Sequence, residues 1–249
     1  MNHEAIPAFY GMRTWTPLVM TFSVIIPTYN EGRFIEKTIQ HILQFGGKAI
    51  KEILVIDGGS TDDTVQKARK AGATTLLSPQ KGRGAQLHFG AEQSKANILY
   101  FVHADTLPPE AFVTEIEQAL AEGWQMGNFQ YNFDSSSFLL RINGFFTRFR
   151  WFFTQGGDRT FFIRRETYFN LGGYNPDHVI MEEYEFLRRA GKQGYGFAML
   201  PCQCTVSARK YEHNSWLRVQ LANFVVYNLW SWGLASLPKL KSIYSRILR

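Results

Sequence analysis

Leu99-Tyr100-Phe101-Val102-His103-Ala104-Asp105-Thr106 is the stretch around which this sequence is organised. It begins with a run of apolar residues, which is typical of a buried strand, and it ends abruptly in a His-x-Asp pair. Parallel α/β sheets bind their ligands at the carboxyl ends of strands. Two interpretations follow: His103 and Asp105 hold a divalent cation against a phosphate, or they begin a polar loop before Pro108.

Apolar runs alternate with helical patterns around this stretch. Short runs predict four strands, over residues 22–26, 53–56, 74–77 and 98–102. Apolar spacing and capping residues predict helices over 31–45, from Thr61 onward, and over 84–95. Repeated strand–helix units imply an α/β fold, with a mostly parallel sheet and helices on both of its faces.

The downstream half has a different character. We expect an antiparallel strand over 124–133, a strand over 160–163, a helix over 181–190 and a final strand pair over 195–207. Residues 138–153 are aromatic and rich in arginine. They predict either a helix that carries an acceptor or touches lipid, or a helix whose arginine stems cover apolar surface.

Composition bounds the class of protein. With 249 residues, 45% hydrophobic and 19% charged, the chain is globular and long enough for a sizeable core. Its net charge of +6 suits an anionic partner. Cys202 and Cys204 have no second pair to complete a zinc site, so we interpret them as reduced thiols of a cytoplasmic protein. The first residues lack the pattern of a signal peptide.

The C-terminal segment has no charged residue between Arg218 and Lys239, although polar side chains interrupt it. We interpret it as an amphipathic helix rather than a membrane span. One face would carry Leu221, Val225, Leu229 and Trp232. Basic residues follow, as in segments that lie on an anionic membrane surface. Packing on the protein's own core, or in a homodimer interface, is the alternative.

Three further motifs bear groups suited to chemistry. Asp57-Gly58-Gly59-Ser60 follows a strand and offers a carboxylate to a nucleobase or ribose. Lys81-Gly82-Arg83-Gly84 places two cations ahead of a helix, which suits a pyrophosphate. Glu182-Glu183 begins a helix, where acids are favoured by the helix dipole and where one of them can act as a general base. Each motif alone is also compatible with a simple turn, a solvated loop or a helix start.

Taken in order, these motifs resemble the family-2 glycosyltransferases over about residues 22–211. The match begins at Ser23-Val24-Ile25-Ile26-Pro27-Thr28-Tyr29-Asn30-Glu31 and includes Gly156-Gly157-Asp158. The His-x-Asp-Thr motif and Ser207-Ala208-Arg209-Lys210-Tyr211-Glu212 are similar to a bacterial subgroup of that family. The resemblance implies a GT-A-like fold and a nucleoside-diphosphate sugar as donor, with UDP favoured over GDP.

The resemblance also implies roles for individual residues. Glu183 would be the catalytic base, with Glu182 as its alternative. Asp105 would bind a divalent cation, Mn²⁺ or Mg²⁺, and His103 is a second ligand, a group that hydrogen-bonds to the ligands, or a spacer. Acceptor contacts would come from Gly157, Asp158 and Arg209. Nucleotide contacts would come from Pro27, Thr28, Tyr29, Glu31, Asp57, Gly58, Lys81, Arg83, Gly84 and Ala104.

Two departures from the family pattern bear on the chemistry. His103 stands where the family has the first aspartate of Asp-x-Asp, and neutral imidazole suits Mn²⁺ better than Mg²⁺. Glu183 stands where the family has an aspartate, so its base reaches one methylene further.

The sequence thus predicts an inverting, metal-dependent glycosyltransferase that acts on a hydroxyl acceptor; the sequence does not identify this acceptor, and a lipid or apolar one is a candidate. We expect an irregular lead-in (1–20), a glycosyltransferase domain (21–212, with a nucleotide-binding half over 21–106 and an acceptor half over 107–212) and C-terminal helices (213–249). The expected location is the cytoplasm, including the inner face of the plasma membrane if those helices bind lipid. The alternatives are a sugar nucleotidyltransferase and a non-catalytic, membrane-associated protein that binds nucleotide sugars; nucleic-acid binding has no supporting motif.

Overall fold

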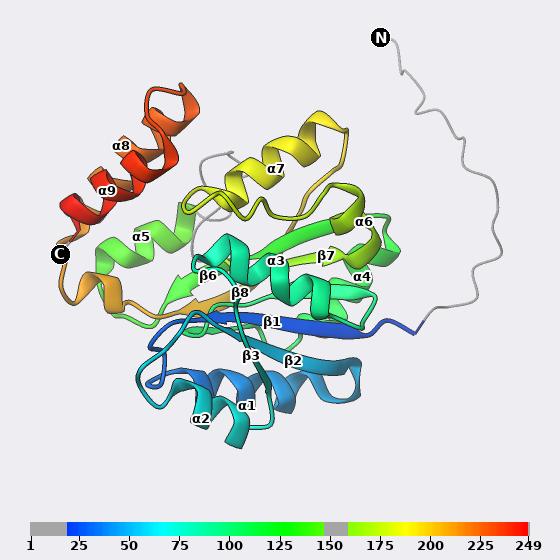
Figure 1. Ribbon diagram of the computed structural model, residues 1–249. Coiled ribbons are helices and arrows are strands. Elements are labelled where there is room, and N and C mark those ends of the chain that lie inside the picture. The colour runs from blue at the N-terminus through cyan, green and yellow to red at the C-terminus, as the bar shows by residue number, and fades with distance from the viewer. Residues whose placement is uncertain (1–18, 147–158, 249) are drawn as a thin grey trace, which may run out of the picture.

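A mixed sheet with the strand order β3-β2-β1-β4-β7-β6-β8-β5 forms the centre of the computed structural model, which describes residues 19–146 and 159–248 (Figure 1). The strands are β1 (Phe22–Thr28), β2 (Ile50–Asp57), β3 (Thr74–Leu77), β4 (Ile98–Phe101), β5 (Thr106–Leu107), β6 (Met126–Phe133), β7 (Phe161–Arg164) and β8 (Ala198–Val206). The helices are α1 (Ile35–Gly46), α2 (Thr64–Lys70), α3 (Arg83–Gln93), α4 (Phe112–Ala121), α5 (Phe138–Phe146), α6 (Arg165–Asn170), α7 (Glu182–Lys192), α8 (Trp216–Ser231) and α9 (Leu237–Ile247).

The first four long strands run parallel and set the position of the site. β1 pairs with β2 on one side and with β4 on the other, and β2 pairs with β3. The chain therefore moves outward from β1 in one direction and returns to its other side, so a topological switch point lies between β1 and β4. Crevices at such points, beyond the carboxyl ends of the strands, are where open α/β sheets bind ligands.

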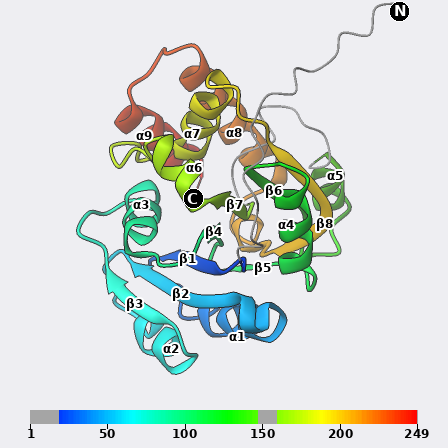
Figure 2. The ribbon, with the colours of Figure 1, turned by 90° about the vertical axis from the view of Figure 1, so that its right-hand side faces the viewer.

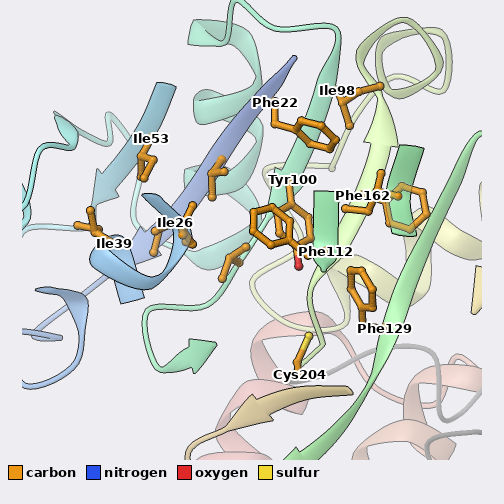
Figure 3. Packing of buried hydrophobic residues seen from close by; sticks show 14 of the residues in the cluster. Phe22, Ile26, Ile39, Ile53, Ile98, Tyr100, Phe112, Phe129, Phe162 and Cys204 are labelled. Carbon is orange, nitrogen blue, oxygen red and sulfur yellow. The ribbon is translucent and has the colours of Figure 1, made fainter. Parts of the chain in front are cut away.

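Two apolar clusters cover the two faces of the sheet, and strand residues alternate between them. Val24 and Ile26 point into one cluster, whereas Ile25 between them points into the other, because successive side chains of a strand lie on opposite faces. The first cluster packs under α1 and α4 and includes Tyr100 stacked on Phe112, with ring centroids 5.3 Å apart (Figure 3). The second packs under α3, α6 and α7, on the opposite side of the sheet from α1 and α2 (Figure 1).

The elements agree with most of the expected boundaries. The four predicted parallel strands all form, with β3 over the predicted residues and the others extended or shortened by a few residues. One expectation is wrong: residues 195–207 do not form a strand pair. They contribute a single strand, β8, which pairs with β6 along its length and continues past a register shift at Phe129/Gln130. The predicted helix over 138–153 is described only as far as α5, and the rest lies outside the described residues.

The C-terminal segment folds back on itself as two helices, α8 and α9, which pack against each other beside α7 (Figures 1 and 2). We call α8, α9 and the loop between them the C-terminal hairpin. The buried stripe of α8 consists of Val219, Ala222 and Val226. The apolar face predicted for this helix is therefore split, because Leu221 and Trp232 are exposed. Within the described residues no helix is long and apolar enough to cross a membrane.

Candidate active site

The ends of β1 and β2 form a loop pair held by hydrogen bonds. Asp57, at the end of β2, is buried, and its carboxylate accepts hydrogen bonds from the backbone N–H groups of Gly59 and Ser60, each at 2.9 Å. The backbone N–H of Asn30, after β1, donates to Ser60 Oγ at 2.9 Å. Asn30 has a positive φ of 57°, a conformation that asparagine tolerates better than most residues. The turn directs the next residue, Glu31, toward the switch point.

The loop that carries Lys81 and Arg83 leads into α3, and Gln86 fastens that helix to the sheet. Gln86 is buried, and its Nε2 donates to the carbonyl oxygens of Thr28 and Ile56, at 2.8 Å each. Gly84 sits so close to α7 that an added Cβ would lie 3.2 Å from Glu182 Cβ. The basic loop is thus held at the carboxyl ends of β1 and β2. Sequence reasoning missed Gln86, and its only signal is a polar residue on the apolar face of a helix.

The two acids that begin α7 face this loop. Arg83 Nε donates to Glu182 Oε1, and Arg83 Nη2 lies 3.8 Å from Glu183 Oε1. His103 Nε2 lies 4.0 Å from the same Glu183 oxygen. Both carboxylates are buried, Glu182 at 2% and Glu183 at 9% exposure, so Glu183 is the more accessible. Four residues predicted for the site from three distant motifs therefore meet at one place.

On the other side of the switch point, one guanidinium joins two predicted site acids. Arg209 begins a short 3-10 helix, Arg209–Tyr211. Its Nη1 and Nη2 donate to the two carboxylate oxygens of Glu31 at 2.6 and 2.7 Å, and its Nε lies 2.9 Å from Asp105 Oδ2. Arg209 was predicted to contact the acceptor. In the structure it lies between a predicted nucleotide residue, Glu31, and the predicted metal ligand, Asp105.

The donor set around Asp105 is compatible with a divalent cation held jointly by the protein and a substrate. The described residues contain no cluster of three or more His, Cys, Asp and Glu side chains in metal-binding geometry. Mg²⁺ commonly binds one or two carboxylates together with substrate phosphates and water. Asp105 supplies such a carboxylate, and its charge is matched by the Arg209 guanidinium here. His103 faces Glu183, so Asp105 is the better candidate for a ligand.

Two tyrosines, the buried Tyr174 and the half-buried Tyr184, lie near the acids of α7. The pKa of Tyr174 lies well above its usual range, first because of burial and then because of the nearby Glu183 charge. Burial and the same charge also raise the pKa of Tyr184. Burial lowers the pKa of Arg159, which shares a cavity of about 10 Å³ with Glu183 and Tyr174. Such a cavity has room for about one water.

A larger pocket of about 450 Å³ lies beside Arg209. Its polar walls include Arg33 and His213, and its apolar walls include Phe34 at the start of α1 and Leu248 after α9. The C-terminal hairpin therefore reaches the edge of the candidate site.

The remaining predicted residues are placed as follows. Tyr29 is 56% exposed beside the site, where its ring is available to a ligand. Ala104 is buried in the core, and its carbonyl accepts a hydrogen bond from Thr38 of α1 at 2.6 Å, so its side chain serves packing. Pro27, Thr28, Gly58 and Lys81 lie in or beside the loops already described. Gly157 and Asp158 lie outside the described residues.

Comparison with known proteins assigns the family. The model of glycosyl transferase family 2 matches residues 23–181, which is more than half of the chain. The chain belongs to glycosyl transferase family 2. The matched range includes the loops after β1, β2 and β4, the basic loop before α3, and the residue that precedes Glu182. The expectation of a glycosyltransferase is thereby confirmed at the level of the family.

Curated relatives match part of the chain. The glucosyl-3-phosphoglycerate synthase of Mycolicibacterium smegmatis is 31% identical over 98 residues, which is 36% of this chain and 32% of that protein. Glycosyltransferase AglE of Haloferax volcanii is 35% identical over 98 residues, with the same two shares. The matched stretch thus spans about a third of the length of these relatives.

Solved structures share the fold over most of the chain. The mannosyltransferase PcManGT from Pyrobaculum calidifontis, in complex with GDP-Man and Mn²⁺, gives a TM-score of 0.67 at 19% identity and covers 90% of this chain and 68% of its own. The glucosyl-3-phosphoglycerate synthase from Mycobacterium tuberculosis, in complex with Mg²⁺ and UDP, gives a TM-score of 0.60 at 19% identity and covers 87% and 84%. These likenesses confirm the expected GT-A-like fold of this family-2 chain.

Proposed function

We propose that this chain transfers a sugar from a nucleoside-diphosphate sugar to a hydroxyl acceptor, with inversion at the anomeric carbon. The observation that carries the proposal is the meeting of two sets of groups at the β1–β4 switch point. Glu31, Asp57 and Asp105 end or follow the parallel strands, while Arg83 and Glu183 face them from α3 and α7. This is the arrangement that a charged donor and a proton acceptor require.

The donor would lie across the strand ends. Asp57 and Glu31 would contact the base and ribose, and Lys81 and Arg83 would offset the charge that grows on the diphosphate as it leaves. A divalent cation bound at Asp105 would supply further positive charge to the diphosphate. Both relatives with solved structures were captured with such a cation and a nucleotide, UDP in one and GDP-Man in the other. We favour UDP for this chain.

Glu183 would act as the general base and Glu182 would position Arg83. Glu182 is almost fully buried and already accepts a hydrogen bond from Arg83 Nε. Glu183 is more exposed, and Arg83 Nη2 lies 3.8 Å from its Oε1, so of the two carboxylates it is the one that an acceptor hydroxyl would reach. Tyr174, which is buried, lies beside Glu183 and limits the access of bulk water from that side.

The proposed step conserves atoms and charge. The acceptor hydroxyl oxygen bonds to the anomeric carbon from the face opposite the leaving group, while the bond from that carbon to the diphosphate oxygen breaks. The electron pair goes to the diphosphate, and the hydroxyl proton goes to Glu183. Attack from the opposite face produces inversion.

The acceptor and its location are proposed with the rest. The aromatic α5 and the C-terminal hairpin favour a lipid or otherwise apolar acceptor, reached by a protein that rests on a membrane surface from the cytoplasmic side. We keep the proposed division into a nucleotide-binding half (21–106), an acceptor half (107–212) and C-terminal helices (213–249).

The base is tested by Glu183→Gln, which preserves size and hydrogen bonding but cannot take the proton. We expect nucleotide binding to be retained by calorimetry and sugar transfer to fall by a factor of about 10²–10⁴. Glu185→Gln is the matched control on the same helix, because Glu185 pairs with Arg189 at 2.7 Å instead of facing the site. Transfer near the wild-type rate in Glu183→Gln would remove Glu183 as the base.

The donor site is tested by Asp105→Ala and by a screen of nucleotide sugars. Thermal shift with and without Mn²⁺ should single out one base, because a ligand that binds only the folded state raises stability by mass action. In Asp105→Ala the Mn²⁺-dependent part of that shift should disappear. An undiminished Mn²⁺-dependent affinity in the variant would show that Asp105 is not a ligand, and nucleotide binding without any product release would favour the non-catalytic alternative.

A further inference from the structure

Helix α8 carries apolar side chains on two opposite sides. Val219, Ala222 and Val226 form the buried stripe described above. Leu217, Leu221 and Phe224 follow the spacing i, i+4, i+7 and are 72%, 55% and 67% exposed. At about 100° per residue the centres of these two groups lie on opposite sides of the helix. A helix that is apolar all round is normally covered all round.

The exposed group continues into the loop between α8 and α9. Trp232 is 71% exposed and Leu234 is 65% exposed. We call Leu217, Leu221, Phe224, Trp232 and Leu234 the outer face of the hairpin. Apolar side chains scattered singly on a surface need no explanation, but five large ones within eighteen residues of one hairpin indicate a surface that meets an apolar phase.

The charge of the hairpin indicates which kind of partner covers its outer face. Residues 213–248 contain no aspartate or glutamate. They contain four basic side chains, Arg218, Lys239, Lys241 and Arg246, and the last three are exposed. Trp, Phe and Leu on one side with Lys and Arg nearby is the composition of helices that lie in the plane of an anionic bilayer surface.

A second copy of the chain fits this surface less well. A symmetric dimer would bring the same basic hairpin against itself, without acidic partners to offset the charge. The whole chain is also positive, at +6, so its long-range field opposes self-association and favours an anionic surface.

The hairpin is also continuous with the candidate active site. Its inner face packs on the start of α7 through Met181 and Tyr184, and Leu248 after α9 lines the pocket beside Arg209. Asn143 of α5 accepts a hydrogen bond from Trp216 Nε1 at 3.1 Å, which holds the first turn of α8 to an aromatic helix where Phe138 is 71% exposed. The hairpin is thus tied to α7, to α5 and, through Leu248, to the wall of that pocket.

We propose that the outer face of the C-terminal hairpin docks the protein on an anionic lipid bilayer, in the plane of the headgroups and without crossing it. The proposal rests on the proposed function only for its purpose, which is to bring the pocket to an acceptor held in the bilayer. Docking itself needs no turnover.

The test is flotation of the full chain with vesicles of phosphatidylcholine alone and of phosphatidylcholine mixed with phosphatidylglycerol. We expect binding to the mixed vesicles only, and weaker binding as salt is raised. Leu221→Ser combined with Phe224→Ser should lower the partition coefficient by at least roughly tenfold, since two large apolar side chains no longer leave water. Both side chains are exposed, so the variant should unfold at the wild-type temperature, which circular dichroism would check.

Leu77→Ser is the matched control. Leu77 ends β3 and is 70% exposed, and strand β3 lies on the side of the molecule away from the hairpin in both views (Figures 1 and 2). It should leave vesicle binding unchanged. Equal binding to both kinds of vesicle, no binding to either, or unchanged binding of the double variant would overturn the proposal. So would a concentration-dependent dimer in sedimentation that the double variant abolishes, because the outer face would then be an interface between copies.

The outcome is separable from that of the proposed function. Nucleotide-sugar binding, measured by thermal shift in the absence of vesicles, should be the same in the double variant and the wild type. Vesicle binding without any nucleotide-sugar binding would reject the proposed function and support docking. Turnover of the nucleotide sugar by a protein that binds neither kind of vesicle would reject docking and support the proposed function.

Discussion

Removing Arg209 tests whether this guanidinium takes the place of a cation in the candidate site. Arg209 contacts both oxygens of Glu31 and one of Asp105, and the side chains of the two acids are only 15% and 14% exposed. Arg209→Ala removes this guanidinium from both carboxylates at once. An exposed ion pair contributes under about 1 kcal/mol and breaking a buried one costs about 3–5 kcal/mol. The guanidinium is 37% exposed, so we expect a loss of about 2 kcal/mol.

The assay is thermal unfolding in EDTA and in Mn²⁺. For a chain of 249 residues, about 2 kcal/mol corresponds to a fall in Tm of about 4–8 °C in EDTA. Mn²⁺ should restore much of this loss, because the ion then supplies the charge that Arg209 supplied. Mn²⁺ alone should also bind the variant about tenfold more tightly than the wild type, since it no longer competes with the guanidinium for Asp105.

Arg33→Ala is the matched control for this variant. Arg33 lines the same pocket, but its side chain is 71% exposed and its nearest acid, on Glu212, is 3.9 Å away. We expect a change in Tm within about 2 °C. If Arg209→Ala behaved like Arg33→Ala in EDTA, or if Mn²⁺ shifted the two variants equally, the charge-replacement reasoning would be refuted.

Four further substitutions probe helix α3, helix α7 and the buried Cys204. Gln86→Ala removes the donor shared by two buried carbonyls. It should lower the free energy of unfolding in urea by about 2 kcal/mol and weaken nucleotide binding. A loss below about 0.5 kcal/mol would contradict the role of Gln86. Gly90→Ala would place a methyl group 2.5 Å from Ile25 and should destabilise the folded protein by about 1–3 kcal/mol. Gly191→Ala, in an open part of α7, should stabilise it by about 0.5–1 kcal/mol. Burial raises the pKa of Cys204 to about 12, so the folded state holds this proton more tightly than the unfolded state. Stability should therefore fall as the pH rises from 9 toward 12, and Cys204→Ala should flatten that slope in alkaline denaturant titrations.

The parallel half of the fold could be predicted because its signals are local. Val24, Ile25 and Ile26 are all apolar, and a strand that is buried on both faces must read this way. The pairing of β7 between β4 and β6 has no such signal, because these strands lie far apart in the sequence. For the same reason residues 195–207 were expected to form a strand pair: a sequence pattern does not show that one strand continues past a register shift.

In the candidate site, too, some residues could be predicted from local sequence signals and others could not. Asp57, Asp105 and Glu183 follow or begin elements that could be located from the sequence, so their convergence at the strand ends was predictable in outline. The partner of Glu31 was not, because Arg209 lies 178 residues away and only the fold brings the two together. Helix α8 shows a related limit of prediction from sequence. Sequence periodicity assumed one apolar face, whereas the helix uses one side for its own core and leaves another exposed.

The packing of the C-terminal hairpin also bears on how this protein should be handled. Val226 and Leu240 complete the apolar cover of Met181, the residue before the two acids of α7. Removing residues 213–249 to improve solubility would expose Met181 to solvent. We expect the amides of α7 to exchange hydrogen faster in such a fragment, with Glu182 and Glu183 held less firmly. Changing Leu221 and Phe224, which do not support α7, is the milder route to a better-behaved protein.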